Sequence, residues 1–179
     1  VADGQVRVRV FEINKKGEKK DMVYERLFLV DETKVVNVYG VGDDDIFRVS
    51  GKVNQSIKVR LIGGQGKDLF EDESQVLGAD RLTHVYDDKE KNTVNGGIET
   101  ADKRTRQRIY NLYDHRARHN AYGYSVPLPI LGVNPDDGFL IGLNLSKTTY
   151  KFKKDPYHAQ HKFVGSYAFA TNAWYLQYD

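Results

Sequence analysis

A phrase of twelve residues occurs twice in this chain, and it limits the folds that the first hundred residues can adopt. VNVYGVGDDDIF begins at Val36, and VRLIGGQGKDLF begins 23 residues later at Val59. A fixed period of this length is typical of stacked strand–turn units, each of which needs a neighbour to bury its apolar face. The alignment predicts that Phe47 and Phe70 take equivalent, buried positions in neighbouring strands of one sheet. A third, weaker copy is expected from Thr83, with one residue inserted.

The residues before the first copy have the pattern of an antiparallel hairpin. Val6 to Ile13 alternates apolar and basic residues with a period of two, which is the mark of a half-buried strand. A charged turn around Gly17 follows, and Met22 to Val30 is the expected returning strand. We therefore predict an all-β domain over residues 1–99, either a short solenoid or a small sandwich.

Composition excludes several classes of function. The chain has 27 basic and 25 acidic residues, a balance that argues against a nucleic-acid-binding protein. It has no cysteine, which excludes disulfides and cysteine-based metal or redox chemistry. No apolar run approaches the roughly 18 to 20 residues of a membrane-spanning helix. The chain begins at Val1 without a signal peptide, and we expect it to be a piece of a longer protein.

Residues 100–122 have a different, basic composition and are predicted to be a linker. One interpretation is a solvated connector with tyrosines between the charges. The other is a patch for anionic partners such as lipid head groups or a polyanionic glycolipid. The arginines that would form this patch are Arg104, Arg106, Arg108, Arg116 and Arg118.

The last third of the chain contains long alternating segments. Phe139 to Phe152 is long for a globular strand, His161 to Ala170 is the expected returning strand, and another strand begins at Ala173. Small and polar residues alternate in the first segment with four apolar ones, Phe139, Ile141, Leu143 and Leu145. Long strands with two such faces are typical of membrane β-barrels, in which the apolar face contacts lipid. An edge hairpin of a soluble sandwich fits the same alternation.

The sequence resembles a known family in the segment YGYSVPLPILGVNPDDGFLIGLNLSKTTYKFKKDPYHAQHKFVGSYAFATNAWYLQYD. The turn NPDDG before a long strand, the loop FKKDPY and the strand HKFVGSYAFAT are similar to the first strands of surface-antigen type outer-membrane barrels. The resemblance is to the version in which the barrel follows a calcineurin-like metallophosphoesterase domain. Upstream, VYERLFLVDETKVVNVYGVGDDDIFRVSG and SIKVRLIGGQGKDLFEDES are similar to the β segment between those two domains.

This resemblance implies a periplasmic β domain over residues 1–99, a basic linker over 100–122 and the first strands of a truncated barrel over 123–179. It implies a location in the outer membrane and periplasm of a Gram-negative bacterium, with lipid and a periplasmic protein as partners. The phosphoesterase motifs D-x-H, G-D and G-N-H-[DE] are absent, so its activity is not carried over. We expect a non-enzymatic segment that links an upstream domain to the barrel, and that self-associates through exposed strands in isolation.

The glycine-rich turns resemble a calcium-binding pattern, and calcium is the one cofactor that the sequence suggests. Gly63 to Phe70 fits the calcium-binding pattern G-G-x-G-x-D-x-U, and the candidate ligands are Asp43, Asp45 and Asp68. A single copy lacks the second turn that completes the oxygen cage, so we predict no high-affinity calcium site. Without calcium, the glycines supply positive φ and the aspartates hydrogen-bond the turns. If the turns do bind calcium, the alternative function is a calcium-dependent β-repeat binding module.

Other polar clusters have ordinary explanations. His115 and His119 have the i, i+4 spacing of a metal site, but neighbouring arginines would repel a cation. The adjacent carboxylates Asp87-Asp88 and Asp136-Asp137 would point to opposite faces of a strand, which makes acid–base chemistry by either pair unfavourable. No G-x-S-x-G sequence marks an activated nucleophile.

Overall fold

The computed structural model describes residues 3–78, 80–116, 122–154 and 156–179. The protein is all-β: strands make up 57% of it, and the described part contains no α-helix. No helix among the described residues is long and apolar enough to cross a membrane. The chain divides into two compact units, Val1–His115 and Arg116–Asp179. Each unit is described by itself.

The first unit begins with the predicted hairpin. β1 (Gln5–Ile13) pairs antiparallel with β2 (Lys19–Leu29), and Val6 lies opposite Phe28. Val6 is buried in the hydrophobic core and Phe28 packs against that core, whereas most side chains of β2 are exposed. The open end of the hairpin therefore covers the core, and the hairpin prediction is confirmed.

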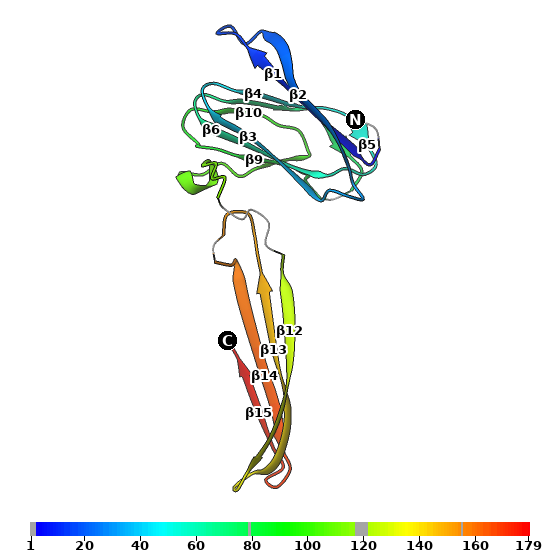
Figure 1. Ribbon diagram of the computed structural model, residues 1–179, viewed down its shortest axis with the longest axis vertical. Helices are drawn as coiled ribbons and strands as arrows, with labels where there is room; N and C mark the ends of the chain where they lie inside the picture. Colours follow the sequence, from blue (N-terminus) through cyan, green and yellow to red (C-terminus); the bar gives the residue numbers. More distant parts are fainter. Residues whose placement is uncertain (1–2, 79, 117–121, 155) are drawn as a thin grey trace. The chain divides into compact units, whose positions relative to one another are not determined.

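Three parallel sheets follow in the first unit (Figure 1). The four-stranded sheet has the order β11-β9-β6-β3, from Thr100–Asp102, Thr83–Tyr86, Lys58–Gln65 and Val35–Gly42. The three-stranded sheet has the order β10-β7-β4, from Thr93–Asn95, Leu69–Asp72 and Ile46–Val49. The two-stranded sheet pairs β5 with β8, Lys52–Val53 with Gln75–Val76.

The register of these sheets places equivalent residues of the repeated phrase beside each other. Val36 pairs with Val59, and Val59 pairs with Thr83 in the next strand. Phe47 pairs with Phe70, and their rings stack with centroids 4.8 Å apart and an interplanar angle of 5°. Both rings are buried, so their predicted equivalence is confirmed. The buried members of this core are Val6, Val36, Phe47, Ile57, Val59, Leu61, Phe70 and Val85.

The segment predicted to be a linker belongs largely to the first unit. Thr100–Asp102 forms β11 and pairs with β9, and the short 3₁₀ turn η1 (Arg108–Tyr110) follows it. Tyr110 stacks on Tyr86 of β9 with centroids 5.9 Å apart, and Tyr113 packs edge-on against Tyr39 of β3. The boundary therefore falls after His115, not before Thr100, because the tyrosines between the arginines pack on the sheet.

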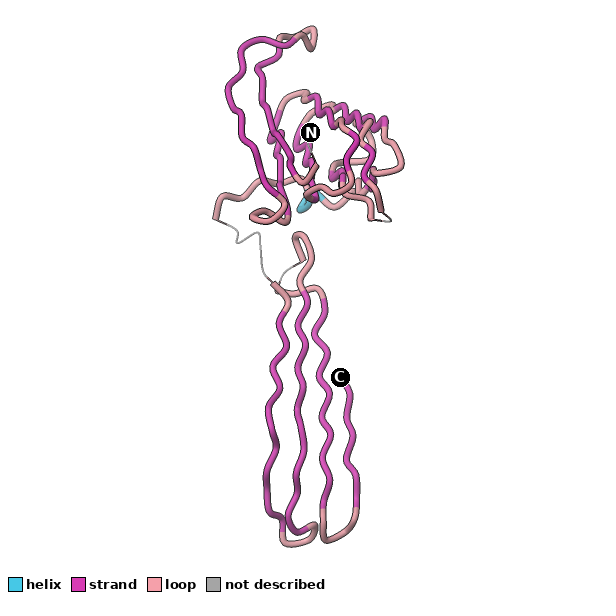
Figure 2. Tube along the Cα trace, turned by 90° about the vertical axis from the view of Figure 1, so that its right-hand side faces the viewer, coloured by secondary structure: helices cyan, strands magenta, loops and turns pink. Residues whose placement is uncertain are grey.

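The second unit is an antiparallel sheet of four strands in chain order (Figure 2). These strands are β12 (Tyr124–Asn134), β13 (Gly138–Thr149), β14 (Ala159–Ala168) and β15 (Ala173–Tyr178). The sequence had indicated only three strands, because the prolines of β12 are typical of turns. β12 is an edge strand, where a missing backbone N–H is tolerated.

Short turns connect this sheet at one end and a longer loop at the other. Gly138, with φ of 69°, closes the turn before β13, and Asn172, with φ of 52°, lies in the turn before β15. The backbone N–H of Asp136 donates to Asn134 Oδ1 at 3.0 Å, which fixes the first turn. The loop over residues 150–158 separates β13 from β14.

Candidate functional site

The second unit has one face that is apolar across all four strands. The pairing aligns side chains in rows, one of which runs Leu131, Ile141, Tyr167 and Trp174. The rows beside it contain the other members of the face: Pro127, Pro129, Val133, Phe139, Leu143, Leu145, Phe163, Gly165, Leu176 and Tyr178. This is the face on which the sequence predicted lipid contact by Phe139, Ile141, Leu143 and Leu145. The structure places those four on one side of β13, as their alternation indicates.

This apolar face lies open. Leu131 is 67% exposed, Trp174 73% and Leu176 66%, and the four predicted residues of β13 are also exposed. Soluble proteins rarely leave contiguous apolar patches of this kind without a partner surface. The face is therefore a candidate interaction surface.

Aromatic residues gather at the end of this face next to the short turns. Tyr167 packs against Trp174 with centroids 4.9 Å apart and edge-on against Phe169 at 5.1 Å. Phe169 in turn lies 5.7 Å from Phe139. The next row, from Pro129 to Leu176, has no aromatic residue, and the row after it contains Phe163 and Tyr178. Tyr178 stacks with His161. The aromatic cluster is therefore at the end of the apolar face that lies next to the short turns.

The opposite face is more polar on three strands. On β13 it carries Gly142, Asn144, Ser146 and Thr148. Gln160 of β14 donates a hydrogen bond from Nε2 to Thr148 Oγ1 at 3.1 Å. On β12 the same face is aliphatic, with Val126, Leu128 and Ile130. The contrast between the two faces is therefore strongest on β13, β14 and β15.

Two of the five arginines of the predicted patch have acidic partners in the first unit. The guanidinium of Arg104 is engaged by Asp102, and Arg106 Nε lies 3.8 Å from Glu90 Oε1 at an exposed site. Arg108 lies in η1, Arg116 begins the second unit, and Arg118 lies outside the described residues. The anionic-partner patch stays a prediction.

A second candidate site lies inside the first unit, where three aspartate side chains lie against the glycines of the repeated phrase. Asp45 follows β3, Asp68 follows β6 and Asp87 follows β9. The backbone N–H of Asp45 donates to Asp68 Oδ1 at 2.9 Å, and that of Asp68 donates to Asn92 Oδ1 at 2.7 Å. We call β3 with β4, β6 with β7, and β9 with β10 successive strand sets. Equivalent turn positions in these sets are occupied by Asp45, Asp68 and Asn92.

Asp87 enters this cluster from a different position. Tyr86 pairs with Ile62, so Asp87 stands where Gly63 stands in the preceding copy. A Cβ atom at Gly63 would collide with Oδ2 of both Asp68 and Asp87, so glycine leaves the space that both carboxylates occupy. Gly40 leaves the corresponding space for Oδ2 of Asp45. The glycines of the repeated phrase therefore have a steric role besides their turn conformation.

Asp68 and Asp87 are buried and Asp45 is half-buried, and all three are incompletely hydrogen-bonded. Asp68 is 2% exposed and Asp87 is 0% exposed, and Oδ2 of each has no hydrogen-bond partner, nor has Oδ2 of Asp45. Burial raises the pKa of Asp87 to about 7, with the adjacent Asp68 adding to the shift. Burial, together with the charges of Asp68, Asp43 and Asp44, raises the pKa of Asp45 to about 6. The pKa of Asp68 is also raised, chiefly by burial.

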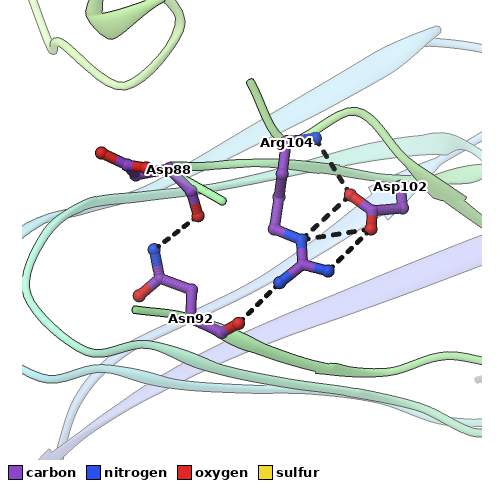
Figure 3. A network of polar contacts seen from close by, with 4 residues as sticks. All are labelled: Asp88, Asn92, Asp102 and Arg104. Carbon is purple, nitrogen blue, oxygen red and sulfur yellow. Dashed lines mark hydrogen bonds and ion pairs between the residues drawn. The ribbon is translucent and has the colours of Figure 1, made fainter. Parts of the chain in front are cut away.

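A network of polar contacts holds the loop after Asp87 in place (Figure 3). Asn92 Nδ2 donates to the backbone oxygen of Asp88 at 3.0 Å, and Arg104 Nη1 donates to the backbone oxygen of Asn92 at 2.6 Å. The Arg104 side chain also donates to Oδ1 and Oδ2 of Asp102, which lowers the pKa of Asp102. Arg104 therefore joins the loop to β11, and its charge is directed to Asp102 rather than to the buried cluster.

The calcium candidates do not form one set of ligands. Asp45 and Asp68 are in the buried cluster, whereas Asp43 lies in the exposed turn with φ of 68°. Across the described ranges, no group of three or more His, Cys, Asp or Glu side chains is arranged to hold a metal ion. His119, the second histidine of the other metal candidate, lies outside the described residues.

Comparison with known proteins adds no relative. The sequence matches no family model and no curated protein, and no solved structure matches the chain.

Sequence reasoning missed the meeting of Asp68 and Asp87. The sequence places Asp87 in the weaker third copy, but its chemistry was weighed only with its neighbour Asp88, and two adjacent residues of a strand face opposite ways. The signal that would have found the pair is the aligned third copy, in which Asp87 replaces the glycine of Gly40 and Gly63.

Proposed function

We propose that the second unit supplies strands to a membrane-spanning β-barrel in a Gram-negative outer membrane. The first unit is then a non-enzymatic periplasmic module that the barrel holds at the membrane and that connects it to an upstream domain. The observation that carries this proposal is the exposed apolar face across β12 to β15.

The dimensions of the strands agree with this proposal. β12, β13 and β14 have 11, 12 and 10 residues, and a tilted transmembrane strand needs about 9–11 residues. Short turns at one end and a longer loop at the other follow the pattern of outer-membrane barrels. The aromatic cluster around Tyr167 and Trp174 would lie at the interface next to the short turns.

The two edges of the sheet differ in how well they can accept a further strand. Phe139 O accepts a hydrogen bond from the backbone of Phe169, so the odd-numbered residues of β13 bond to β14 and the even-numbered ones to β12. The odd-numbered residues of β12, including Pro127 and Pro129, therefore direct their backbone nitrogen to the free edge. Two of these nitrogens carry no hydrogen, which weakens that edge as a template.

The edge at β15 has no proline, so all its backbone nitrogens carry a hydrogen. Lys162 and Asp179 exchange both backbone hydrogen bonds, which leaves the N–H and C=O groups of Trp174, Leu176 and Tyr178 directed away from β14. These three residues also belong to the apolar face. We infer that the sheet extends from β15, by a further barrel strand or, in the isolated chain, by self-association.

For the first unit we propose a short β-solenoid built from coils of about 23 residues. Its support is the parallel pairing of β3 with β6 and of β4 with β7, each 23 residues apart, and the stacking of Phe47 on Phe70. A solenoid presents an extended, regular surface to a protein partner, which suits a connecting module.

The membrane proposal is tested by placing a charge on one face of β13 and then on the other. Leu143→Arg puts a guanidinium in the middle of the apolar face, and Asn144→Arg puts it on the opposite face, one residue away. Binding to phosphatidylcholine vesicles is measured by flotation, with circular dichroism to check that each variant keeps its strands.

A charge on the lipid face near the bilayer midplane costs about 2–4 kcal/mol, whereas the lumen face tolerates it. We therefore expect Leu143→Arg to lose most vesicle binding and Asn144→Arg to retain it. Equal binding by the two variants, or a wild-type chain that stays in the aqueous fraction, would contradict the proposal.

A further inference from the structure

The buried carboxylates of the first unit form a feature that the membrane proposal does not use. Oδ2 of Asp68 and Oδ2 of Asp87 both border the space that a side chain at Gly63 would fill, and neither oxygen has a hydrogen-bond donor. No ion pair joins either carboxylate to a basic side chain in the part of the chain that the structure describes. Buried charges without a counter-charge or a donor are strongly unfavourable.

The other oxygen of each carboxylate is already satisfied. Asp68 Oδ1 accepts the backbone N–H of Asp45, and Asp87 Oδ1 accepts both the backbone N–H of Asp88 at 2.6 Å and Asn111 Nδ2 at 3.0 Å. Oδ2 of Asp68 and Oδ2 of Asp87 therefore face each other as two hydrogen-bond acceptors without a donor between them. A single proton supplies it, because a protonated carboxyl donates to the neighbouring carboxylate.

We propose that Asp68 and Asp87 form a proton-binding site, in which one shared proton joins the strand sets of β6 and β9. The proton makes the first unit responsive to pH, independently of any membrane role of the second unit. Loss of the proton leaves two facing carboxylates in a buried place, and like charges so close repel each other.

The surroundings of the pair strengthen this dependence. The turn between β3 and β4 contributes Asp45, Asp43 and Asp44, all of which are acidic. The loop after β9 contributes Asp88, and the segment after η1 contributes the amide of Asn111. The nearest guanidinium in the network around Asn92, that of Arg104, is held by Asp102. Asn111 ties the pair to the end of the first unit, so loss of the proton loosens that segment and β9 first.

The direction of the pH effect follows from the raised pKa values. Between the usual carboxyl pKa of 3.8 and about 7, the folded chain holds a proton that the unfolded chain has lost. Stability therefore falls as pH rises through this window and becomes flat above it. One linked proton changes the unfolding equilibrium constant by about tenfold per pH unit within the window.

Amide substitutions test the shared proton directly. In Asp87→Asn the new Nδ2 group donates to Asp68 Oδ2 at every pH, while its Oδ1 keeps the bonds from Asp88 and Asn111. In Asp68→Asn the same bond runs in the opposite direction. The double variant places two donors against each other and satisfies neither. Asp88→Asn is the matched control, because its side chain lies outside the pair.

Urea unfolding of the full chain is followed from pH 5 to pH 9. We expect each single variant to lose about one proton of the pH dependence and to exceed the wild type in stability at pH 8. The double variant is expected to be less stable than either single variant at every pH, and Asp88→Asn to keep the wild-type profile. The proposal is wrong if the single variants keep the full wild-type slope or if the double variant is the most stable.

A further experiment with calcium distinguishes the binding of a proton from the binding of a metal ion. The same unfolding curves are measured at pH 8 with 5 mM calcium (about the scale used to saturate weak sites) and with a chelator. We expect the curves to coincide. A wild-type chain that calcium stabilises, with the effect absent in both single variants, would replace the shared proton by a metal ion and overturn the proposal.

Discussion

Val41 of β3 pairs with Gly64 of β6, and both residues have positive φ, 77° for Val41 and 106° for Gly64. Positive φ is unstrained for glycine, but it is a genuine outlier for a β-branched residue. The first copy of the repeated phrase thus keeps the backbone of the second copy without its glycine, at a cost of about 1–3 kcal/mol.

This relationship predicts opposite effects for two substitutions. Val41 is exposed, so Val41→Gly removes strain without uncovering a core contact, and we expect it to stabilise the first unit by about 0.5–1 kcal/mol after the entropy of glycine is subtracted. Gly64→Ala should destabilise it, because a Cβ there would collide with the backbone of Val41. Chemical unfolding measures both. Destabilisation by Val41→Gly would show that the turn is not strained.

The glycines that face the buried carboxylates give a second prediction. A Cβ at Gly40 would collide with Asp45 and with the backbone oxygen of Gly63, whereas one at Gly42 would lie 3.9 Å from the nearest atom, Gln65 O. Gly40→Ala is therefore expected to cost about 1–3 kcal/mol, the usual range for overpacking, and Gly42→Ala well under half of that. Similar unfolding midpoints for the two variants would contradict the close packing of this turn.

The stacked rings give a third prediction. Truncation of Phe70, the more deeply buried ring, to alanine should cost about 3–5 kcal/mol, and Phe47→Ala somewhat less. Because the two rings are in contact, the cost of the double variant should be smaller than the sum of the single costs by about 0.5–1.5 kcal/mol. Strict additivity in this double-mutant cycle would mean that the rings do not interact.

The prolines of β12 give a fourth prediction, which concerns association. Pro127→Thr with Pro129→Thr restores two N–H groups at the free edge, and we expect stronger self-association through that edge. The matched control is Leu128→Thr, whose backbone already faces β13. Sedimentation velocity in mild detergent measures the oligomer distribution. An unchanged distribution in the double proline variant would argue that this edge is covered in some other way.

Much of this fold could be predicted from local patterns in the sequence. The hairpin, the long alternating strands and the equivalence of Phe47 and Phe70 all follow from spacings between residues close in sequence. β12 was missed because Pro127 and Pro129 are acceptable only at an edge, and the edge is a property of the whole sheet.

The sites depended more strongly on tertiary structure. Alternation in the sequence indicated the apolar sides of single strands, but the width of the apolar face came from the register of the four strands. The third copy with one inserted residue was predicted, but the meeting of Asp68 with Asp87 depended on the pairing of β6 with β9, which sets Asp87 level with Gly63. The basic segment was misjudged because its tyrosines, Tyr110 and Tyr113, pack on the first unit.

The chain contains a single tryptophan, Trp174, which lies on the apolar face within the aromatic cluster near the short turns. Its fluorescence therefore reports on the apolar face without any label, and brominated lipids measure the depth of the ring in a bilayer. If this face contacts lipid, vesicles will shift the emission of Trp174 to shorter wavelength and protect it from acrylamide. Bromines close to the head groups will then quench it more strongly than bromines at the bilayer centre, as interfacial aromatic residues require. Unchanged emission in the presence of vesicles, with acrylamide quenching as strong as in buffer, would contradict the account.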